Sequence, residues 1–208
     1  MEITYTTLTY ELAEPVANLI NSCFPDMTDD DRYVPEDLEL MADLFAEGSI
    51  VALGGSRQIV VGFGTGIFTD FDTDNMPVEE SEVLGHLCVG NHDPAGDFYY
   101  GSEFCVHPDY RCQRIGRNIY DKRKEVIVKN NKKGFYAASV LQGYTDYKDK
   151  VDVHQYLSMV ENQTAYDPTL TMQLRNGFEI IKPLHNFFDH PPSNHWSALI
   201  YWENNSYE

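Results

Sequence analysis

The stretch Phe104–Ile127, "FCVHPDYRCQRIGRNIYDKRKEVI", joins a strand pattern to a helix pattern through a polar turn. The strand ends at a His-Pro pair, and the helix has one glycine near its start. Because the N-terminus of a helix offers unpaired N–H groups and a partial positive charge, we expect a phosphate-bearing ligand here, with an ordinary basic helix face as the alternative. Six of the fifteen basic residues of the chain cluster in this stretch: Arg111, Arg114, Arg117, Lys122, Arg123 and Lys124.

The composition fits a folded protein with a sizeable core. The chain has 208 residues, of which 42% are hydrophobic and 13% aromatic, so we expect one domain over residues 1–208. The sequence has no apolar run of about 18 residues and no signal-peptide pattern at its start, which predicts a cytoplasmic protein without a membrane span. Its four cysteines form no C-x-x-C pair, so free thiols are expected.

The formal net charge of −18 argues against nucleic acid or an anionic membrane as a partner. It leaves three interpretations: a solvated acidic surface, a field that attracts a small cationic substrate, or adaptation to salt. The acidic segment "DFDTDN" begins like a calcium loop, but Asn75 and Ser81 replace the glycine and the glutamate of an EF-hand. No metal site is predicted there, or at the histidines spaced by five residues, His185, His190 and His195.

The hydrophobic periodicity predicts the element order β-α-α-β-β-β-α-β-α-α-β, which is typical of a mixed sheet with helices on its faces. Strands are expected at 3–10, 49–55, 58–71, 98–106, 134–141 and 197–203. Helices are expected at 13–24, 34–48, 114–129, 151–162 and 167–176, the last stopped by the Asn-Gly pair at 176–177.

The segment "VHPDYRCQRIG" resembles the acyl-CoA signature of the GNAT superfamily of N-acetyltransferases, V-x-P-x-[Y/F]-[R/Q]-x-x-G-x-[G/A]. One position departs, because Arg114 stands where the family has the first glycine. The likeness extends over about residues 100–202, and the block 143–179 resembles a subgroup often joined to carbon–nitrogen hydrolase domains. The matching residues are Val106, Pro108, Tyr110, Arg111 and Gly116.

This resemblance implies an α/β (α+β) fold with a mixed, mostly antiparallel central sheet, flanking helices and splayed central strands. The exposed backbone of the strand before the signature would pair with the pantetheine arm of acetyl-CoA and polarise its carbonyl. The loop and the first helical turn would hold the pyrophosphate. The implied acetyl-CoA site comprises Phe104, Cys105, Val106, Arg111, Cys112, Gln113, Arg114, Ile115, Gly116 and Arg117.

Proton transfer needs a residue that the family pattern does not supply here. Many relatives carry a tyrosine four residues before the Gly-Phe glycine, and that position is Gln173 in this chain. Glu103 is the predicted base, since strand alternation puts it on the face of Cys105 and opposite Phe104. A solvated carboxylate and amphipathic wall tyrosines are the alternatives. Further candidates are Tyr100, Tyr144 and Tyr166.

The sequence therefore predicts an N-acetyltransferase that passes the acetyl group of acetyl-CoA to a primary amine by direct attack. The acidic surface favours a small cationic acceptor. The departures at Gln173 and Arg114 keep open an inactive acyl-CoA-binding sensor or partner module. A protein-modifying acetyltransferase and a homodimer are also left open.

Overall fold

A seven-stranded sheet lies at the centre of the protein, with its strands in the order β1-β2-β3-β4-β5-β7-β6. The computed structural model describes residues 2–29, 32–56, 58–70 and 72–208. Neighbouring strands are antiparallel except for β4 and β5, which run parallel, so the predicted mixed sheet is confirmed. The strands are β1 (Ile3–Thr7), β2 (Ile50–Gly54), β3 (Ile59–Thr69), β4 (Phe98–Val106), β5 (Gly134–Val140), β6 (Glu179–His185) and β7 (Trp196–Glu203).

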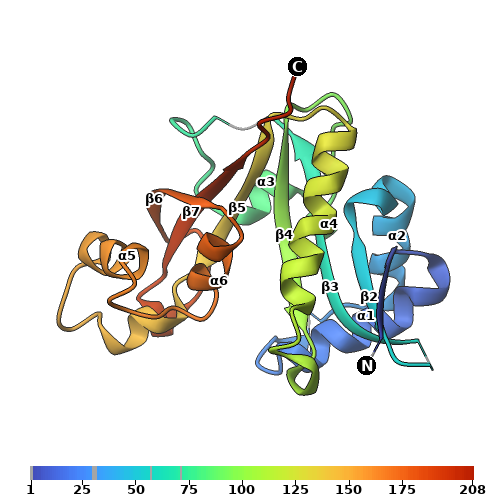
Figure 1. Cartoon of the computed structure of the whole chain (residues 1–208), viewed down its shortest axis with the longest axis horizontal. Coiled ribbons are helices and arrows are strands. Elements are labelled where there is room, and N and C mark those ends of the chain that lie inside the picture. The colour runs from blue at the N-terminus through green and yellow to red at the C-terminus, as the bar shows by residue number, and fades with distance from the viewer. Residues whose placement is uncertain (1, 30–31, 57, 71) are drawn as a thin grey trace.

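Helices flank the sheet on both faces (Figure 1). Apolar side chains of α4, α5 and α6 form one core with the sheet, and those of α1, α2 and α3 form a second core on the other face. No helix within the described part of the chain is long and apolar enough to cross a membrane. The helices are α1 (Tyr10–Cys23), α2 (Pro35–Phe45), α3 (Glu80–Leu84), α4 (Ile115–Lys129), α5 (Val153–Glu161) and α6 (Leu170–Arg175).

Local sequence signals explain where two of the helices begin. Pro35 opens α2, because its fixed backbone angle and missing N–H suit the first helical position. The Asp37 carboxylate then accepts a hydrogen bond from the Val34 N–H at 2.9 Å. Asp152 precedes α5 and accepts from the Gln155 N–H at 2.8 Å. Both helices were predicted from the sequence.

The element order differs from the prediction at two places. The short helix α3 lies where no helix was predicted, and β6 was not predicted either. β4 has the predicted bounds, and α4 begins one residue later than expected. Phe71, at the predicted end of the third strand, lies outside the described residues.

β4 contains one extra residue where it pairs with β3. Gly64 lies opposite Phe104 and Gly66 lies opposite Gly101, so two steps along β3 match three steps along β4. This is a β-bulge, and it interrupts the regular alternation of side chains between the two faces of the sheet. Side chains three residues apart across the bulge can therefore share a face.

β4 and β5 separate halfway along their length. They pair from Phe98 and Gly134 as far as Gly101 and Ala137. Beyond that point β4 remains paired with β3, and β5 remains paired with β7. Residues 102–106 of β4 thus leave the backbone groups of one edge unpaired with β5, and Figure 1 shows the two strands diverging. The predicted splay of the central strands is confirmed.

Arg123 of α4 is buried at the point where the strands separate. Its Nε donates to the Tyr99 hydroxyl at 2.9 Å, and an Nη donates to the carbonyl of Thr65, which has no partner in the β3–β4 register. Gly101 leaves room for it, since a Cβ there would lie 2.3 Å from the guanidinium. A buried charge needs such partners, so Arg123 belongs to the core and is not part of an anion site.

A buried carboxylate fixes the position of α6 against the segment that precedes it. Asp167 is fully buried and accepts four hydrogen bonds of 2.9–3.0 Å. Two come from the Thr169 and Leu170 N–H groups at the start of α6, and two from the Gly143 N–H and the Tyr156 hydroxyl. A buried carboxylate is tolerated when its oxygens are satisfied in this way, and the network holds α6 beside the separated strands.

Candidate active site

The loop before α4 has a backbone suited to an anion. Cys112 and Arg114 have positive φ angles of 62° and 64°, and Arg114 is the left-handed residue directly before the helix. Alternation of left-handed residues with others turns successive N–H groups toward one side, and the first N–H groups of α4 have no partner within the helix. Arg114 thus adopts the conformation that glycine adopts most readily.

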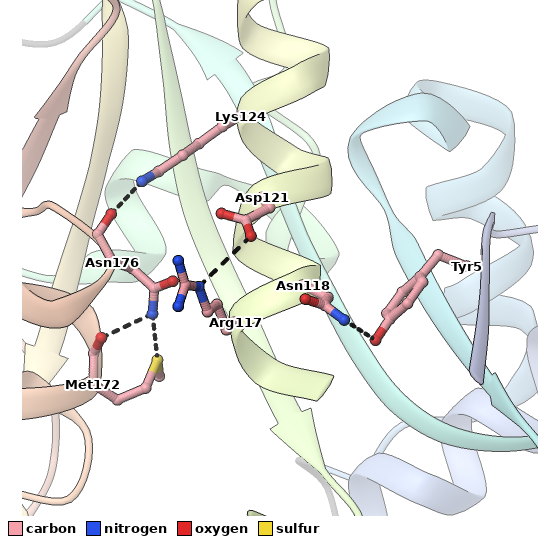
Figure 2. A network of polar contacts seen from close by, with 7 residues as sticks. All are labelled: Tyr5, Arg117, Asn118, Asp121, Lys124, Met172 and Asn176. Carbon is pink, nitrogen blue, oxygen red and sulfur yellow. Dashed lines mark hydrogen bonds and ion pairs between the residues drawn. The ribbon is translucent and has the colours of Figure 1, made fainter. Parts of the chain in front are cut away.

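Most of the basic residues on α4 are engaged elsewhere in the protein. Arg123 is in the core, and the Lys124 ammonium donates to the carbonyl of Asn176 at the end of α6 (Figure 2). Lys122 pairs with Glu125 at 2.8 Å. The basic residues therefore do not act as one anion site, which corrects the simplest interpretation of their clustering.

The charges nearest the loop belong to three arginines that lie on the surface. The Arg111 Nε donates to the carbonyl of Val106 at 3.1 Å and ties the loop to β4. Arg117 lies 3.9 Å from Asp121 on α4 and both side chains are exposed, and Figure 2 draws the pair. Arg114 is exposed beside it. Arg114 and Arg117 are thus the positive side chains available to a phosphate at this helix end.

Close packing explains why position 116 is a glycine, a reason that the sequence did not indicate. A Cβ at this position would lie 2.9 Å from the Phe104 ring, so the glycine lets the first turn of α4 pack on β4. The side chain of Ile115 is 1% exposed and belongs to the core. Only the backbone of these two residues is open to a ligand. Cys112 and Gln113 are exposed in the loop.

Four buried polar atoms around the separated strands have no hydrogen-bond partner within the described residues. Ser102 lies on β4 and Ser139 on β5, both beyond the last β4–β5 pair. Gln173 and Asn176 lie in α6 and directly after it. Since an unsatisfied buried polar atom costs about 1–3 kcal/mol, each of the four is a candidate to bind a polar ligand. The atoms are Ser102 Oγ, Ser139 Oγ, Gln173 Oε1 and Asn176 Oδ1.

Glu103 lies on the opposite face of β4 from α4. Its Oε1 accepts a hydrogen bond from the Tyr33 hydroxyl at 3.0 Å, and that hydroxyl lies 3.5 Å from the Cys88 sulfur. Removal from water raises the pKa of the Glu103 carboxyl, and the hydrogen bond from Tyr33 partly opposes this. The predicted orientation is confirmed, because Cys105 packs in the core of this face and Phe104 in the other.

A second carboxylate, Glu80, lies beside Glu103. The Tyr100 hydroxyl donates to Glu80 Oε1 at 3.0 Å, and the bulge explains how Tyr100 and Glu103 come to share a face. Burial and the charge of Glu103 raise the pKa of Glu80 to about 8. Two neighbouring carboxyl groups with raised pKa values are suited to proton transfer from an amine.

A pocket of about 470 Å³ opens beside Glu80. Its walls come from α3 and from the segment between β6 and β7, which meet where the Glu80 N–H donates to the Phe187 carbonyl at 3.3 Å. Glu79, Glu80 and Asp189 make the lining acidic, while Phe187 and Phe188 add aromatic surface. A carboxylate with an unusual pKa is thus reachable from solvent.

Comparison with known proteins agrees with this geometry. A model of the acetyltransferase (GNAT) family matches residues 13–143. The chain belongs to the GNAT acetyltransferase family.

Two relatives and a solved structure resemble the chain over nearly its whole length. The chain is 28% identical over 93% of its length to a probable hydrolase, YhcX, from Bacillus subtilis strain 168, and spans 37% of that protein. It is 25% identical over 94% of its length to an uncharacterized N-acetyltransferase, YkwB, of the same bacterium, and spans 86% of it. The loading GNATL domain of CurA from Lyngbya majuscula superposes with a TM-score of 0.81 at 14% identity, covering 98% of both chains.

GNAT membership confirms the predicted enzyme class. The residues that the family model matches thus form an acyltransferase domain that uses an acyl-CoA, the predicted cofactor class. The match to part of a longer probable hydrolase also agrees with the predicted subgroup.

Two of the predicted catalytic tyrosines lie away from the Glu103 carboxyl. Tyr144 is buried in the segment after β5 and its hydroxyl donates to the Val151 carbonyl at 3.0 Å. Tyr166 is 63% exposed before α6. Gln173, at the position of the usual GNAT tyrosine, is 3% exposed. The structure therefore brings together Glu103 and Tyr100, but not the other two candidates.

Cys105 contacts a second thiol instead of a base. The hydrogen bond with Cys105, together with Arg111, lowers the pKa of the Cys23 thiol to about 7, while the same hydrogen bond and burial raise the pKa of Cys105. A thiol that resists ionisation is a poor nucleophile. The Cys105 side chain is thus unsuited to carry an acyl group.

Sequence reasoning missed three residues beside the Glu103 carboxyl or its partner: Tyr33, Glu80 and Cys88. They come from two regions of the chain, one between α1 and α2 and the other at α3 and just after it. No local signal in the sequence placed the Glu80 carboxylate next to Glu103.

Proposed function

We propose that the protein is an N-acetyltransferase that transfers the acetyl group of acetyl-CoA to the primary amine of a small cationic acceptor. The observation that carries this proposal is the carboxylate pair, because Glu80 faces the acidic pocket on one side and Glu103 on the other. Family membership supports acyl transfer to an amine. The acidic lining supports a cationic acceptor over a neutral or anionic one.

The residues around the separated strands fit an acyl-CoA. The pantetheine arm carries two amides, which suit the unpartnered Ser139 and Gln173 side chains and the free edge of β4. The loop at 111–117, with the side chains of Arg114 and Arg117, suits the pyrophosphate. The pantetheine arm, bound between the separated strands, would provide hydrogen-bond partners for polar atoms that otherwise have none.

The bound acetyl-CoA supplies an activated thioester carbonyl to the reaction. N–H groups on the free edge of β4 would hold the carbonyl oxygen, as predicted for Phe104, Cys105 and Val106. Glu103 would accept the proton that the acceptor ammonium must lose, and Glu80 would relay it to the solvent through the pocket. Phe187 and Phe188 would enclose the apolar part of the acceptor. Residues 1–208 would act as a single domain, and a homodimer stays an open prediction.

The first test is calorimetric titration with acetyl-CoA. We expect micromolar binding by the natural protein and at least tenfold weaker binding by Arg114→Glu/Arg117→Glu. A matched control, Lys129→Glu/Lys150→Glu, reverses two exposed lysines away from the loop and should bind normally. Equal binding by all three proteins would contradict the phosphate site.

The acceptor class is tested by release of free thiol from acetyl-CoA with three kinds of amine. We expect diamines and polyamines to be better substrates than monoamines, and monoamines better than amino acids, whose carboxylate the pocket repels. Binding of acetyl-CoA without turnover of any amine or peptide would favour the inactive module, which Gln173 in place of the usual tyrosine keeps as the second candidate.

A further inference from the structure

Tyr120 and Gln173 meet where the two halves of the sheet separate. The Gln173 Nε2 donates to the Tyr120 hydroxyl oxygen at 3.0 Å, joining α6 to α4. Since the oxygen accepts this bond, the phenol keeps its own proton to donate, and the described residues contain no acceptor for it. Both side chains are nearly fully buried, at 2% and 3% exposure.

The Tyr120 ring contacts both separated strands. Its centroid lies 4.9 Å from the Phe104 ring on the free part of β4 and 5.8 Å from the Phe135 ring on β5. The unpartnered Gln173 Oε1 and Ser139 Oγ lie around the same gap. The hydroxyl of Tyr120 is thus held among the polar atoms that indicate a ligand.

Charged and titratable neighbours bear on the chemistry of this phenol. Burial raises the pKa of Tyr120, while the Arg123 guanidinium, 5.5 Å from its ring centre, opposes the rise. The phenol of Tyr99 lies on the far side of Arg123. The Lys124 ammonium lies over the neighbouring Phe178 ring, 5.1 Å from the ring centroid. The phenol therefore stays protonated, in a positive environment that favours an anion beside it.

We propose that Tyr120, positioned by Gln173, donates the proton to the thiolate that leaves acetyl-CoA. In this chain the acid thus comes from α4, and the glutamine on α6 orients it where the family carries its own tyrosine. This inference rests on the proposed function, since it needs coenzyme A between the separated strands.

The proton balance of the step is simple. As the bond between the amine nitrogen and the acyl carbon forms and the carbon–sulfur bond breaks, the electron pair passes to sulfur. The Tyr120 O–H proton moves to that sulfur, giving the free thiol and a tyrosinate that Arg123 stabilises. The tyrosinate recovers a proton from water, and the acceptor's own proton leaves through Glu103.

The decisive experiment measures the bound product and needs no turnover. Free coenzyme A is bound to the natural protein and to Tyr120→Phe, and the thiol is titrated by the ultraviolet absorbance of its thiolate. We expect the pKa of the bound thiol to be about one unit lower in the natural protein, a tenfold change, because only the phenol donates to the thiolate. Equal pKa values in the two proteins would overturn this proposal and leave the acyltransferase function standing.

Two further variants separate a chemical role from a packing role. Tyr120→Phe should lower kcat at least tenfold with little change in KM for acetyl-CoA. Tyr120→Phe/Gln173→Tyr returns a phenol from α6 and should recover most of the lost kcat. Tyr201→Phe removes a phenol that donates to the Lys133 carbonyl at 3.1 Å and should leave kcat unchanged. A failure of the double variant to recover kcat and thiol pKa together would contradict the role of the phenol, and a lack of coenzyme A binding would overturn the proposed function as well.

Discussion

The loop before α4 and the carboxylate cluster behind β4 perform opposite electrostatic tasks with differently assembled parts. The loop is one continuous segment, Arg111 to Arg117, with two left-handed residues and three exposed arginines. The cluster joins Tyr33, Glu80 and Glu103 from three separate segments, and its carboxyl groups are withdrawn from water. The loop and the cluster thus lie on opposite sides of β4.

This difference shows why a cofactor site can be found in a sequence more readily than an acceptor site. Binding of a pyrophosphate needs only backbone geometry at a helix start, which a short signature encodes. Proton transfer needs two carboxyl groups with shifted pKa values, which depend on burial and on neighbours from elsewhere in the chain. If the two regions act separately, a change in one should leave the function of the other intact.

The largest effect is expected from Glu103→Gln. We expect kcat to fall at least 100-fold, because the amide cannot accept a proton, while acetyl-CoA binding stays unchanged. The fold should tolerate the change, since the amide oxygen can still accept from the Tyr33 hydroxyl. Steady-state kinetics and calorimetry on the same preparations measure the two quantities.

Glu161→Gln provides the control for this change. It removes an equal charge from an exposed position at the end of α5 and should leave kcat unaltered. Retention of kcat by Glu103→Gln would move the role of base to Glu80. A loss of acetyl-CoA affinity would show that the two regions are coupled.

How much of this site could be predicted from the sequence depends on how local each feature is. The loop, β4 and α4 were predicted because their residues are contiguous. The bulge was not, since it arises from the pairing of Gly64 and Gly66 with a longer stretch of β4. Strict alternation places Tyr100 and Glu103 on opposite faces, and the bulge brings them to the same one.

The two missed elements have physical reasons of their own. α3 is only five residues long and lies in an acidic segment that follows Pro77, a composition typical of a loop. β6 contains Pro183 and lacks regular alternation, but it lies at the edge of the sheet, where a missing N–H is tolerated. The cluster depends on α3, so this missed helix also hid Glu80.

Glu80 should make the protein less stable as the pH rises. Its carboxyl stays protonated in the folded protein up to a pKa of about 8, whereas the unfolded chain ionises near the ordinary value of 4.5. The unfolded state thus binds fewer protons between these values, and the free energy of unfolding falls as pH rises through this window. We expect the fall to be about 2 kcal/mol larger in the natural protein than in Glu80→Gln, less than a full shift gives because the side chain is partly exposed.

Urea denaturation at about pH 5 and at about pH 8 measures this difference. Glu14→Gln, an exposed change on α1, controls for the reduced net charge of the whole chain. Its free energy of unfolding should change with pH as much as that of the natural protein. If the free energy of unfolding changes equally with pH in Glu80→Gln and in the natural protein, the Glu80 carboxyl is ionised in the folded state. That result would argue against the carboxylate cluster as a proton path.

The pocket should contribute more to acceptor affinity than the acidic segment at residues 70–75. Glu79→Gln/Asp189→Asn should raise KM for a diamine about fivefold, since both carboxylates line the pocket. Neutralising Asp70, Asp72 and Asp74 should raise it less than about twofold, because exposed charges outside the pocket are screened. Asp72 in particular is occupied in a turn, accepting from the Asp74 N–H at 2.9 Å.

An uncharged aromatic amine serves as the control substrate for both variants. Its KM should not change, because it gains nothing from a carboxylate field. A larger effect from the loop variant than from the pocket variant would place the acceptor elsewhere on the acidic surface. Equal effects on charged and uncharged amines would indicate damage to the pocket's shape instead of its charge.

The smallest effect concerns the backbone of Arg114. Its φ of 64° suits glycine, so Arg114→Gly should raise the free energy of unfolding by about 0.5–1 kcal/mol, while Arg114→Ala should not. Both variants lose the guanidinium and should bind acetyl-CoA about threefold more weakly, a loss that disappears in about 1 M salt. Denaturation and calorimetry on the two variants therefore separate conformation from charge.

If the glycine variant binds as tightly as the natural protein, the loop depends on its backbone alone and the arginine adds no useful charge. If it binds more weakly than alanine, the stiff left-handed residue itself prepares the loop for the pyrophosphate, and the arginine is an advantage over the family's glycine.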